Sequence, residues 1–262
     1  MISEFINYKG ISIHYKERGK GRALVFLHGF LENLEMWETL ISTIKPSYRI
    51  ICIDLLGHGK TDSLAYVHTM DDMAEAVKAV LDHLKLRRYV VFGHSMGGYV
   101  SLALANKFPK SIIGLGLLNS TTSADSEEKK QNRTRAITAV KKHRTSFIAE
   151  SIKQLFWIEN HKKLEPSINK IQNQALNTGV QGIIAALEGM KVRSDLKHVI
   201  ADGKIKTLIV TGTYDTVIDQ KHLSVLKPYL NGEFHELEGG HMSHVENIKE
   251  FSYIISSFVE KL

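Results

Sequence analysis

A serine stands between a strand pattern and a helix pattern in the sequence Val90-Val91-Phe92-Gly93-His94-Ser95-Met96-Gly97-Gly98. Residues 89–92 form a short continuous apolar run, which is typical of a strand buried on both faces, and residues 96–108 have helical spacing. Small residues at 93 and 97 allow the strand and the helix to pass closely. The sequence therefore predicts a sharp, strained turn that exposes Ser95 at its apex, with the Met96 N–H directed toward a developing oxyanion. The alternative is a glycine-rich turn that contains a serine by chance.

Strand and helix patterns alternate on both sides of this turn. Strand patterns occupy residues 4–8, 11–17, 23–27, 49–53, 112–118, 206–210 and 233–237, and helix patterns occupy residues 34–44, 70–84, 217–229 and 245–261. Such alternation predicts a mostly parallel sheet with helices on both faces. Residues 121–195 contain three or four helix patterns and no strand. We therefore expect a core of residues 1–120 and 196–262 and an inserted helical cap of residues 121–195.

Length and composition exclude several classes of protein. The chain has 262 residues, of which 43% are hydrophobic and 24% charged, so it can bury a sizeable core and is neither collagen-like nor disordered. Its single cysteine, Cys52, excludes an intrachain disulfide. No apolar run approaches the roughly 20 residues of a membrane-spanning helix, and residues 1–10 lack the apolar core of a signal peptide. We expect a cytoplasmic protein without a membrane partner.

The net charge of +6 is concentrated locally, because residues 129–144 hold seven basic residues and no acidic one. Ala136, Ile137 and Val140 supply an apolar stripe between these charges, which favours a solvated helix face. The alternative is an electropositive rim that attracts anionic substrates. We expect no nucleic-acid partner, because the stretch has no interleaved aromatic residues and matches no known binding module.

Two further candidate catalytic residues follow strand patterns near the C-terminus. Asp215 lies just beyond strand 206–210 and could fix a histidine tautomer, although capping the next helix is the alternative. Asp219 is its rival, and Asn119 is excluded as an acid because it does not ionise. His241 follows strand 233–237 and two glycines, which let the chain turn back over the sheet to where a general base must stand.

The remaining candidates are assigned by position. His244 competes with His241, and His94 flanks Ser95, but the His94 side chain is expected to leave the turn in another direction. In His28-Gly29-Phe30, the Phe30 N–H is the candidate for a second oxyanion donor, because an oxyanion hole takes two donors from separate loops. We expect His28 itself to bind loop backbone.

These segments together resemble the α/β-hydrolase superfamily, over nearly the whole chain. The match rests on His28-Gly29-Phe30, on Asp54-Leu55-Leu56-Gly57-His58-Gly59, and on residues 93–98, 212–215 and 239–241. The resemblance implies an eight-stranded, mostly parallel sheet, with Ser95 as nucleophile, Asp215 as acid, His241 as base, and Phe30 and Met96 as oxyanion donors. It also suggests that Arg193 and Asp195 lie where the cap returns to the core. Haloalkane dehalogenases and epoxide hydrolases of this superfamily carry an aspartate at the position of Ser95, so the serine argues against both of these classes.

We therefore expect a serine hydrolase that cleaves a small carboxylic ester through an acyl-enzyme, with no cofactor and no metal. His241-x-x-His244 lacks the acidic partner of a helical zinc motif. The alternatives are a carbon–carbon bond hydrolase, a lyase or a thioesterase with the same triad, or a small-ligand receptor with slow turnover. Phe147, Phe156 and Trp157 are candidates for the apolar lining of the pocket. The sequence leaves the oligomeric state open.

Overall fold

The computed structural model describes residues 1–262 and contains one eight-stranded sheet with strand order β1-β2-β4-β3-β5-β6-β7-β8. Strands β3 to β8 are mutually parallel, whereas β1 and β2 form an antiparallel edge that joins the sheet at β4. The strands are β1 (Ile2–Tyr8), β2 (Ile11–Arg18), β3 (Arg22–Leu27), β4 (Tyr48–Ile53), β5 (Tyr89–His94), β6 (Ile112–Leu118), β7 (Lys206–Gly212) and β8 (Gly232–Leu237). The expected mostly parallel, eight-stranded α/β fold is confirmed.

Ten α-helices accompany the sheet, together with four short 3-10 helices. The helices are α1 (Glu38–Thr43), α2 (Met70–His83), α3 (Met96–Lys107), α4 (Glu127–Gln154), α5 (His161–Ala175), α6 (Val180–Lys191), α7 (Lys197–Ala201), α8 (Gln220–Leu226), α9 (Ser243–Glu246) and α10 (Ile248–Glu260). The 3-10 helices are Leu34–Trp37, Pro109–Ser111, Ile158–Asn160 and Lys227–Tyr229. None of the helices is long and apolar enough to cross a membrane.

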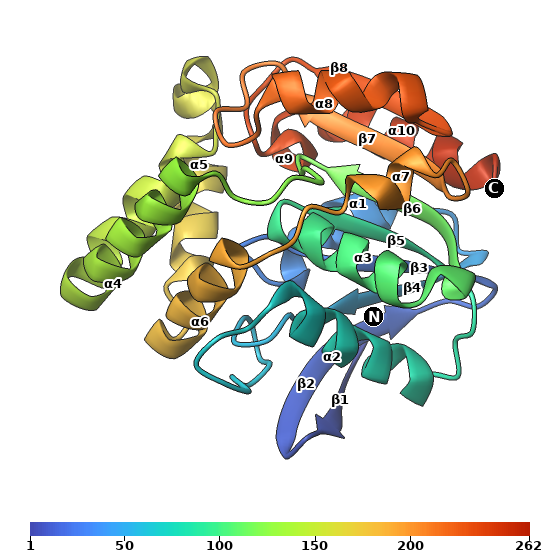
Figure 1. Cartoon of the computed structure of the whole chain (residues 1–262), viewed down its shortest axis with the longest axis horizontal. Coiled ribbons are helices and arrows are strands. Elements are labelled where there is room, and N and C mark those ends of the chain that lie inside the picture. Colours follow the sequence, from blue (N-terminus) through green and yellow to red (C-terminus); the bar gives the residue numbers. More distant parts are fainter.

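The core lies on both faces of the sheet because successive strand residues point to opposite sides. In β3, Leu24 and Phe26 belong to an apolar cluster that includes residues of α1 and α10, such as Phe251. Val25 and Leu27 belong to the other cluster, which includes residues of α2, α3, α7 and α8. Helices therefore cover both faces, as Figure 1 shows, and the carboxyl ends of the parallel strands all lie at one edge.

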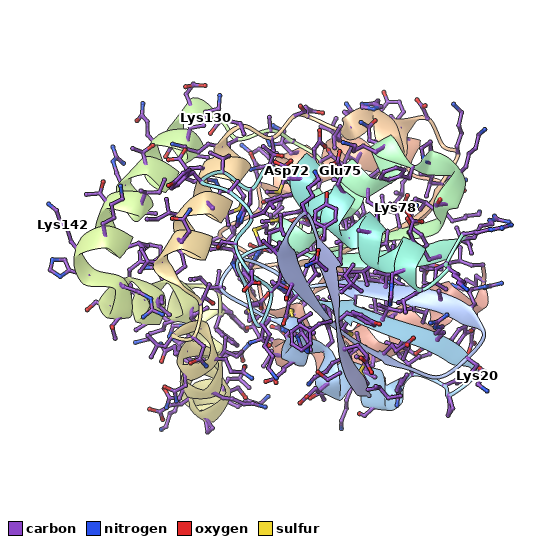
Figure 2. All side chains as sticks on the ribbon, turned by 90° about the horizontal axis from the view of Figure 1, so that it is seen from below. Lys20, Asp72, Glu75, Lys78, Lys130 and Lys142 are labelled. Atoms are coloured by element: carbon purple, nitrogen blue, oxygen red, sulfur yellow. The ribbon has the colours of Figure 1, made fainter.

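Between β6 and β7 the chain contains helices only. Helix α4 packs against α5 and α6, and these three helices, referred to below as the cap helices, form a lobe beside the sheet (Figure 1). Within α4, His143 has non-helical backbone angles, so the helix bends there. Of the seven basic residues in 129–144, Arg135, Lys141 and Lys142 are exposed, as Figure 2 shows for Lys142, and the other four are half-buried.

Candidate active site

Ser95 stands at the apex of a tight turn between β5 and α3, as the sequence predicts. Its φ of 48° and ψ of −114° are a strained combination for a residue with a side chain. A Cβ atom on Gly93 would lie 2.1 Å from the Gly97 carbonyl oxygen, and one on Gly97 would lie 2.4 Å from the Leu27 carbonyl oxygen. The turn can close this tightly only because both residues are glycines.

The structure brings Ser95, His241 and Asp215 together from the ends of three parallel strands. The Ser95 Oγ lies 2.8 Å from His241 Nε2, and His241 Nδ1 lies 2.7 Å from Asp215 Oδ2. His241 and Asp215 are both buried. Because a carboxylate only accepts, His241 donates from Nδ1, which leaves Nε2 free to accept the Ser95 proton. The three residues thus have the geometry of a catalytic triad.

The Asp215 carboxylate has hydrogen-bond partners in addition to His241. Its Oδ1 accepts hydrogen bonds from the N–H groups of Val217 at 2.8 Å and Ile218 at 3.1 Å, and its Oδ2 accepts one from Asn119 Nδ2 at 3.1 Å. Burial alone would raise the pKa of the Asp215 carboxyl, but His241, Asn119 and the Val217 N–H together hold that pKa below its ordinary value. Asp215 is therefore ionised at neutral pH and supports a positive charge on His241.

Asp215 does not cap the following helix, so the capping alternative is wrong. The following helix, α8, begins at Gln220 rather than at 217, and Asp215 Oδ1 accepts the N–H groups of Val217 and Ile218 in the loop before it. Asp219 instead caps α8, accepting a hydrogen bond from the Lys221 N–H at 2.9 Å. It therefore takes no part in the triad geometry.

Two main-chain N–H groups stand free beside the serine. Neither the Phe30 N–H nor the Met96 N–H donates a hydrogen bond within the protein, and Phe30 lines the pocket into which Ser95 opens. Free donors on two separate loops are what an oxyanion hole requires. His28 binds loop backbone as expected: its Nδ1 donates to the Gly29 carbonyl at 2.7 Å and its Nε2 accepts from the Leu55 N–H at 2.9 Å.

The pocket above Ser95 has a volume of about 100 Å³ and a mostly apolar lining. This volume is well below the roughly 300–1,000 Å³ of sites for drug-sized ligands, so the pocket suits a small substrate. The cap helices contribute to it through Arg133 and Ile152 of α4 and Met190 of α6, and Leu155 follows α4. The expected lining by Phe147, Phe156 and Trp157 is wrong. Phe156 is buried in the core, and Trp157 stacks on Tyr214 at 4.2 Å between ring centroids.

A buried ion pair lies directly beneath the serine. His94 Nδ1 is 2.8 Å from Glu32 Oε2, and His94 Nε2 is 2.9 Å from the carbonyl oxygen of His241. Both neighbours are acceptors, so both ring nitrogens carry protons and His94 is an imidazolium. Burial opposes this charge, but Glu32 and the His241 carbonyl raise the pKa of His94 above its ordinary value. The same pairing outweighs the burial of Glu32 and lowers the pKa of its carboxyl to about 2.

Glu32 also organises the loop that carries Phe30. Its Oε2 accepts a hydrogen bond from the Gly29 N–H at 2.7 Å, so the carboxylate links that loop to His94. His244, the rival of His241, lies here instead of beside Ser95, with its ring centroid 4.9 Å from that of His94. Burial and the charge on His94 lower the pKa of His244 to about 3, and it is therefore neutral. His244 has no contact with the serine that would let it act as the base.

Sequence reasoning missed the roles of four side chains at this site. Asn119 was set aside because it cannot ionise, yet it donates to Asp215; its place just after β6 could have indicated this contact. The sequence predicts only that the His94 side chain leaves the turn in another direction, not its contacts with Glu32 and the His241 carbonyl. Glu32 carries no signal except its closeness to His28-Gly29-Phe30. Arg133 lies in the basic stretch 129–144, whose periodicity does not distinguish pocket-facing from solvent-facing charges.

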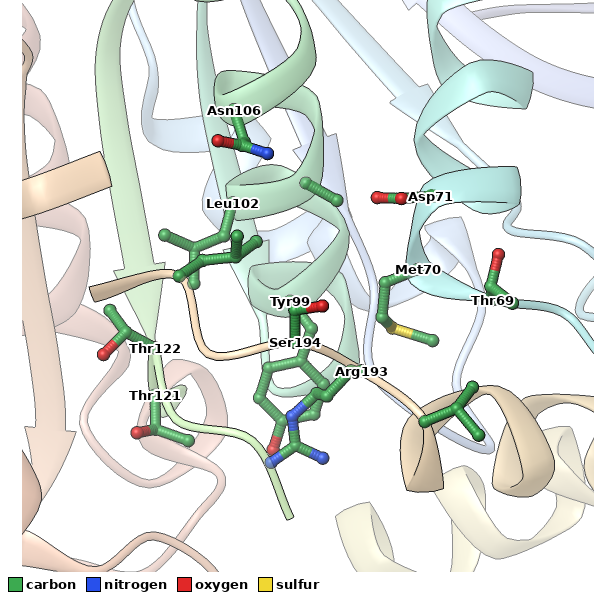
Figure 3. A pocket seen from close by; sticks show the side chains of 13 residues that line it. Thr69, Met70, Asp71, Tyr99, Leu102, Asn106, Thr121, Thr122, Arg193 and Ser194 are labelled. Atoms are coloured by element: carbon green, nitrogen blue, oxygen red, sulfur yellow. The ribbon is translucent and has the colours of Figure 1, made fainter. Parts of the chain in front are cut away.

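A second pocket of about 190 Å³ lies on the far side of Tyr99 and contains none of the triad residues. Figure 3 shows Arg193 against the ring of Tyr99, and the guanidinium carbon is 4.0 Å from the ring centroid. Arg193 also donates to the Ser123 carbonyl at 3.0 Å and pairs with Asp125, while the Leu196 N–H donates to the Thr122 carbonyl at 2.9 Å. The two ends of the segment between β6 and β7 that holds the cap helices, called the helical segment below, are therefore bonded to each other where they meet the core.

Fold and site together define an α/β-hydrolase. Residues 22–248 match the family model for the alpha/beta hydrolase fold, and the chain belongs to that family. Its solved relatives include a thermophilic esterase from Thermogutta terrifontis with malate bound, at 27% identity and a TM-score of 0.92, covering 100% of this chain and 99% of that one.

Two enol-lactonases are also similar to this chain. The enol-lactonase from Burkholderia xenovorans LB400 has 20% identity and a TM-score of 0.90, covering 98% of this chain and 100% of that one. Among curated proteins, 3-oxoadipate enol-lactonase 1 from Acinetobacter baylyi is 24% identical over 255 residues, which are 97% of this chain and 94% of that protein. Proteins described as an esterase and as enol-lactonases thus share this fold.

Proposed function

We propose that this protein is a serine hydrolase of small carboxylic esters that works through an acyl-enzyme. The observation that carries the proposal is the continuous hydrogen-bonded chain from Ser95 Oγ through His241 to Asp215, which opens into a small apolar pocket. The similarity to an esterase at 27% identity supports the same reaction class. Since opening a lactone is the same acyl transfer, the similarity to enol-lactonases supports including cyclic esters.

In the proposed mechanism, Ser95 Oγ attacks the ester carbonyl carbon while His241 Nε2 takes the hydroxyl proton. The carbonyl oxygen becomes an oxyanion that the N–H groups of Phe30 and Met96 bind, and Asp215 stabilises the positive charge on His241. His241 then protonates the departing alcohol and leaves Ser95 acylated. A water molecule, deprotonated by His241, attacks the acyl carbon and releases the acid with Ser95 restored.

The first test is hydrolysis of p-nitrophenyl acetate, butyrate and octanoate by wild type and by Ser95→Ala. Loss of a triad serine lowers turnover by several orders of magnitude, up to about 10⁶-fold. We expect wild type to prefer the two short esters because the pocket is small. Ser101→Ala is the matched control, since Ser101 is a buried serine of α3, the helix that follows Ser95, and its side chain bonds only the Gly97 carbonyl.

Covalent labelling gives a second readout that does not depend on guessing the ester. Phenylmethylsulfonyl fluoride should modify wild type once, as seen by mass spectrometry of the intact protein, and should leave Ser95→Ala unmodified. Equal and slow hydrolysis by both proteins, together with no labelling, would exclude the esterase. Carbon–carbon bond cleavage or binding of a small signalling ligand would then be examined.

A further inference from the structure

The catalytic pocket contains one strongly basic side chain and no carboxylate. Arg133 of α4 lines it together with Ser95 and His241, and every other cap residue in the lining is apolar or a neutral serine. Arg135, two residues further along the same helix, is exposed and bonds only Asn132. One arginine of the basic stretch is therefore directed to the pocket while a neighbour of the same charge is directed to solvent.

The contacts of Arg133 leave part of its guanidinium free. Its Nε pairs with Asp125, and its Nη2 lies 3.3 Å from Asp125 Oδ1, but its Nη1 has no hydrogen-bond partner in the protein. Asp125 is fully buried at its side chain and fixes the orientation of Arg133. Because a guanidinium has five N–H donors in a planar fork, the remaining ones are placed to bind a carboxylate in the pocket.

The charges around Asp125 do not balance. The same carboxylate also pairs with Arg193, whose side chain is 4% exposed, so two guanidinium groups share one negative charge. Lys129 is a third cation beside them, and its ammonium donates at 3.1 Å to the main-chain carbonyl of Val217, a residue of the pocket lining. Burial and repulsion from Arg193 lower the pKa of Lys129. Asp219, a second carboxylate that acts on Lys129, is exposed and caps α8.

An excess of positive charge at the wall of a small pocket is costly unless an anion offsets it. A merely structural brace between the helical segment and the core would need one arginine for Asp125, and Arg193 already supplies it. We propose, resting on the ester hydrolase proposed above, that the substrate carries a carboxylate in addition to its ester group and that Arg133 binds this carboxylate. Arg133 is then the residue that sets specificity for acidic esters.

The experiment compares matched esters that differ only in charge. On the acyl side the pair is monomethyl glutarate and methyl 5-oxohexanoate, and on the alcohol side it is acetoxyacetate and acetoxyacetone. In each pair a methyl ketone replaces the carboxylate at nearly the same size. Titration of released acid gives kcat/KM for wild type, and we expect the anionic member of at least one pair to be preferred by at least about tenfold.

Arg133→Gln should lower the ratio of the two kcat/KM values by about 10- to 100-fold, because it removes a charged hydrogen-bond donor. Arg133→Lys keeps the charge but loses the planar fork, and should restore part of the preference. Arg135→Gln is the matched control: it removes the same charge from the same helix and should leave both kcat/KM values as in wild type. Thermal unfolding of each variant verifies that it is folded.

Binding of glutarate to Ser95→Ala, measured by calorimetry, keeps this inference separate from the proposed function. If wild type hydrolyses no ester, but Ser95→Ala binds glutarate and the additional change Arg133→Gln abolishes this binding, the anion site is supported and the hydrolase is rejected. Turnover of esters without any preference for the anionic members, or a preference that Arg133→Gln leaves unchanged, would overturn the inference while the hydrolase stands. Arg133 would then serve only to brace Asp125.

Discussion

His94 Nε2 lies 2.9 Å from the main-chain carbonyl oxygen of His241, so the residue that precedes the proposed nucleophile holds the backbone of the proposed base. On its other side, the His241 N–H donates to the Leu155 carbonyl at 2.7 Å, just after α4. The peptide groups of His241 are therefore fixed from the core and from the helical segment at once. This arrangement makes the ion pair of His94 and Glu32 a means of positioning the triad.

We predict that Glu32→Gln lowers kcat by about 10- to 100-fold with little change in KM, because a small displacement of His241 and of the loop that carries Phe30 weakens proton transfer and oxyanion binding more than it weakens binding of the substrate itself. Without the carboxylate, buried His94 loses one proton and can donate to only one of its two neighbours. Steady-state kinetics on the best p-nitrophenyl ester gives both parameters. Glu35→Gln, an exposed change in the next turn, is the control. A rise in KM at constant kcat would contradict the positioning role.

The same pair should make stability depend on pH. Glu32 titrates near 2 in the folded protein instead of 4.5, so its contribution is present above pH 4.5 and is lost as the pH falls toward 2. The raised pKa of His94 gives a contribution that is full below 6.5 and is lost as the pH rises through the raised value. The difference in Tm between wild type and Glu32→Gln should therefore be largest between pH 4.5 and 6.5. A difference that is constant from pH 4 to 9 would speak against an ion pair.

Asn119→Asp should damage the triad electrostatically while keeping its shape. Asn119 has a φ of 47°, which aspartate tolerates, and the new carboxylate would lie about as close to Asp215 as the amide does now, at 3.1 Å. Two carboxylates at this distance cannot both ionise freely, so one pKa rises strongly. We expect the acidic limb of the kcat/KM profile to move to higher pH, with a larger loss at pH 6 than at pH 9. A profile parallel to that of wild type would refute this expectation.

Gly93→Ala should destabilise the fold at the serine turn. The added methyl group would meet the Gly97 carbonyl at 2.1 Å, and overpacking of this kind costs about 1–3 kcal/mol or more. Gly179→Ala is the control, since no atom lies within 4 Å of a Cβ there, and it should change the free energy of unfolding by less than about 1 kcal/mol. Chemical denaturation measures both. Equal stabilities would mean that the turn can relax.

The sheet and the three triad residues could be predicted from the sequence because their signals are local. A buried strand, a glycine turn and one polar residue repeat at the ends of β5, β7 and β8, and parallel strands bring those ends to one edge. Glu32, His94 and Arg133 could not be assigned in this way. Arg133 and Arg135 lie in the same basic stretch, and only the packing of α4 on α5 and α6 decides which of them reaches the pocket.

The two ends of the helical segment are bonded to each other where they meet the core. Leu196 bonds Thr122, and Arg193 bonds Ser123 and Asp125. This has a consequence for how such a protein diversifies. Because both ends of the helical segment lie at the same place on the core, its helices can be replaced by a different set of helices without moving β6 relative to β7. Arg133 and most other cap residues of the pocket would travel with the exchanged piece, whereas Ser95, Asp215 and His241 would remain. Under the proposed roles, the residue that sets specificity and the residues that cleave the bond therefore lie on separable stretches of the gene, and hydrogen bonds such as that from the His241 N–H to the Leu155 carbonyl join the two stretches across the site.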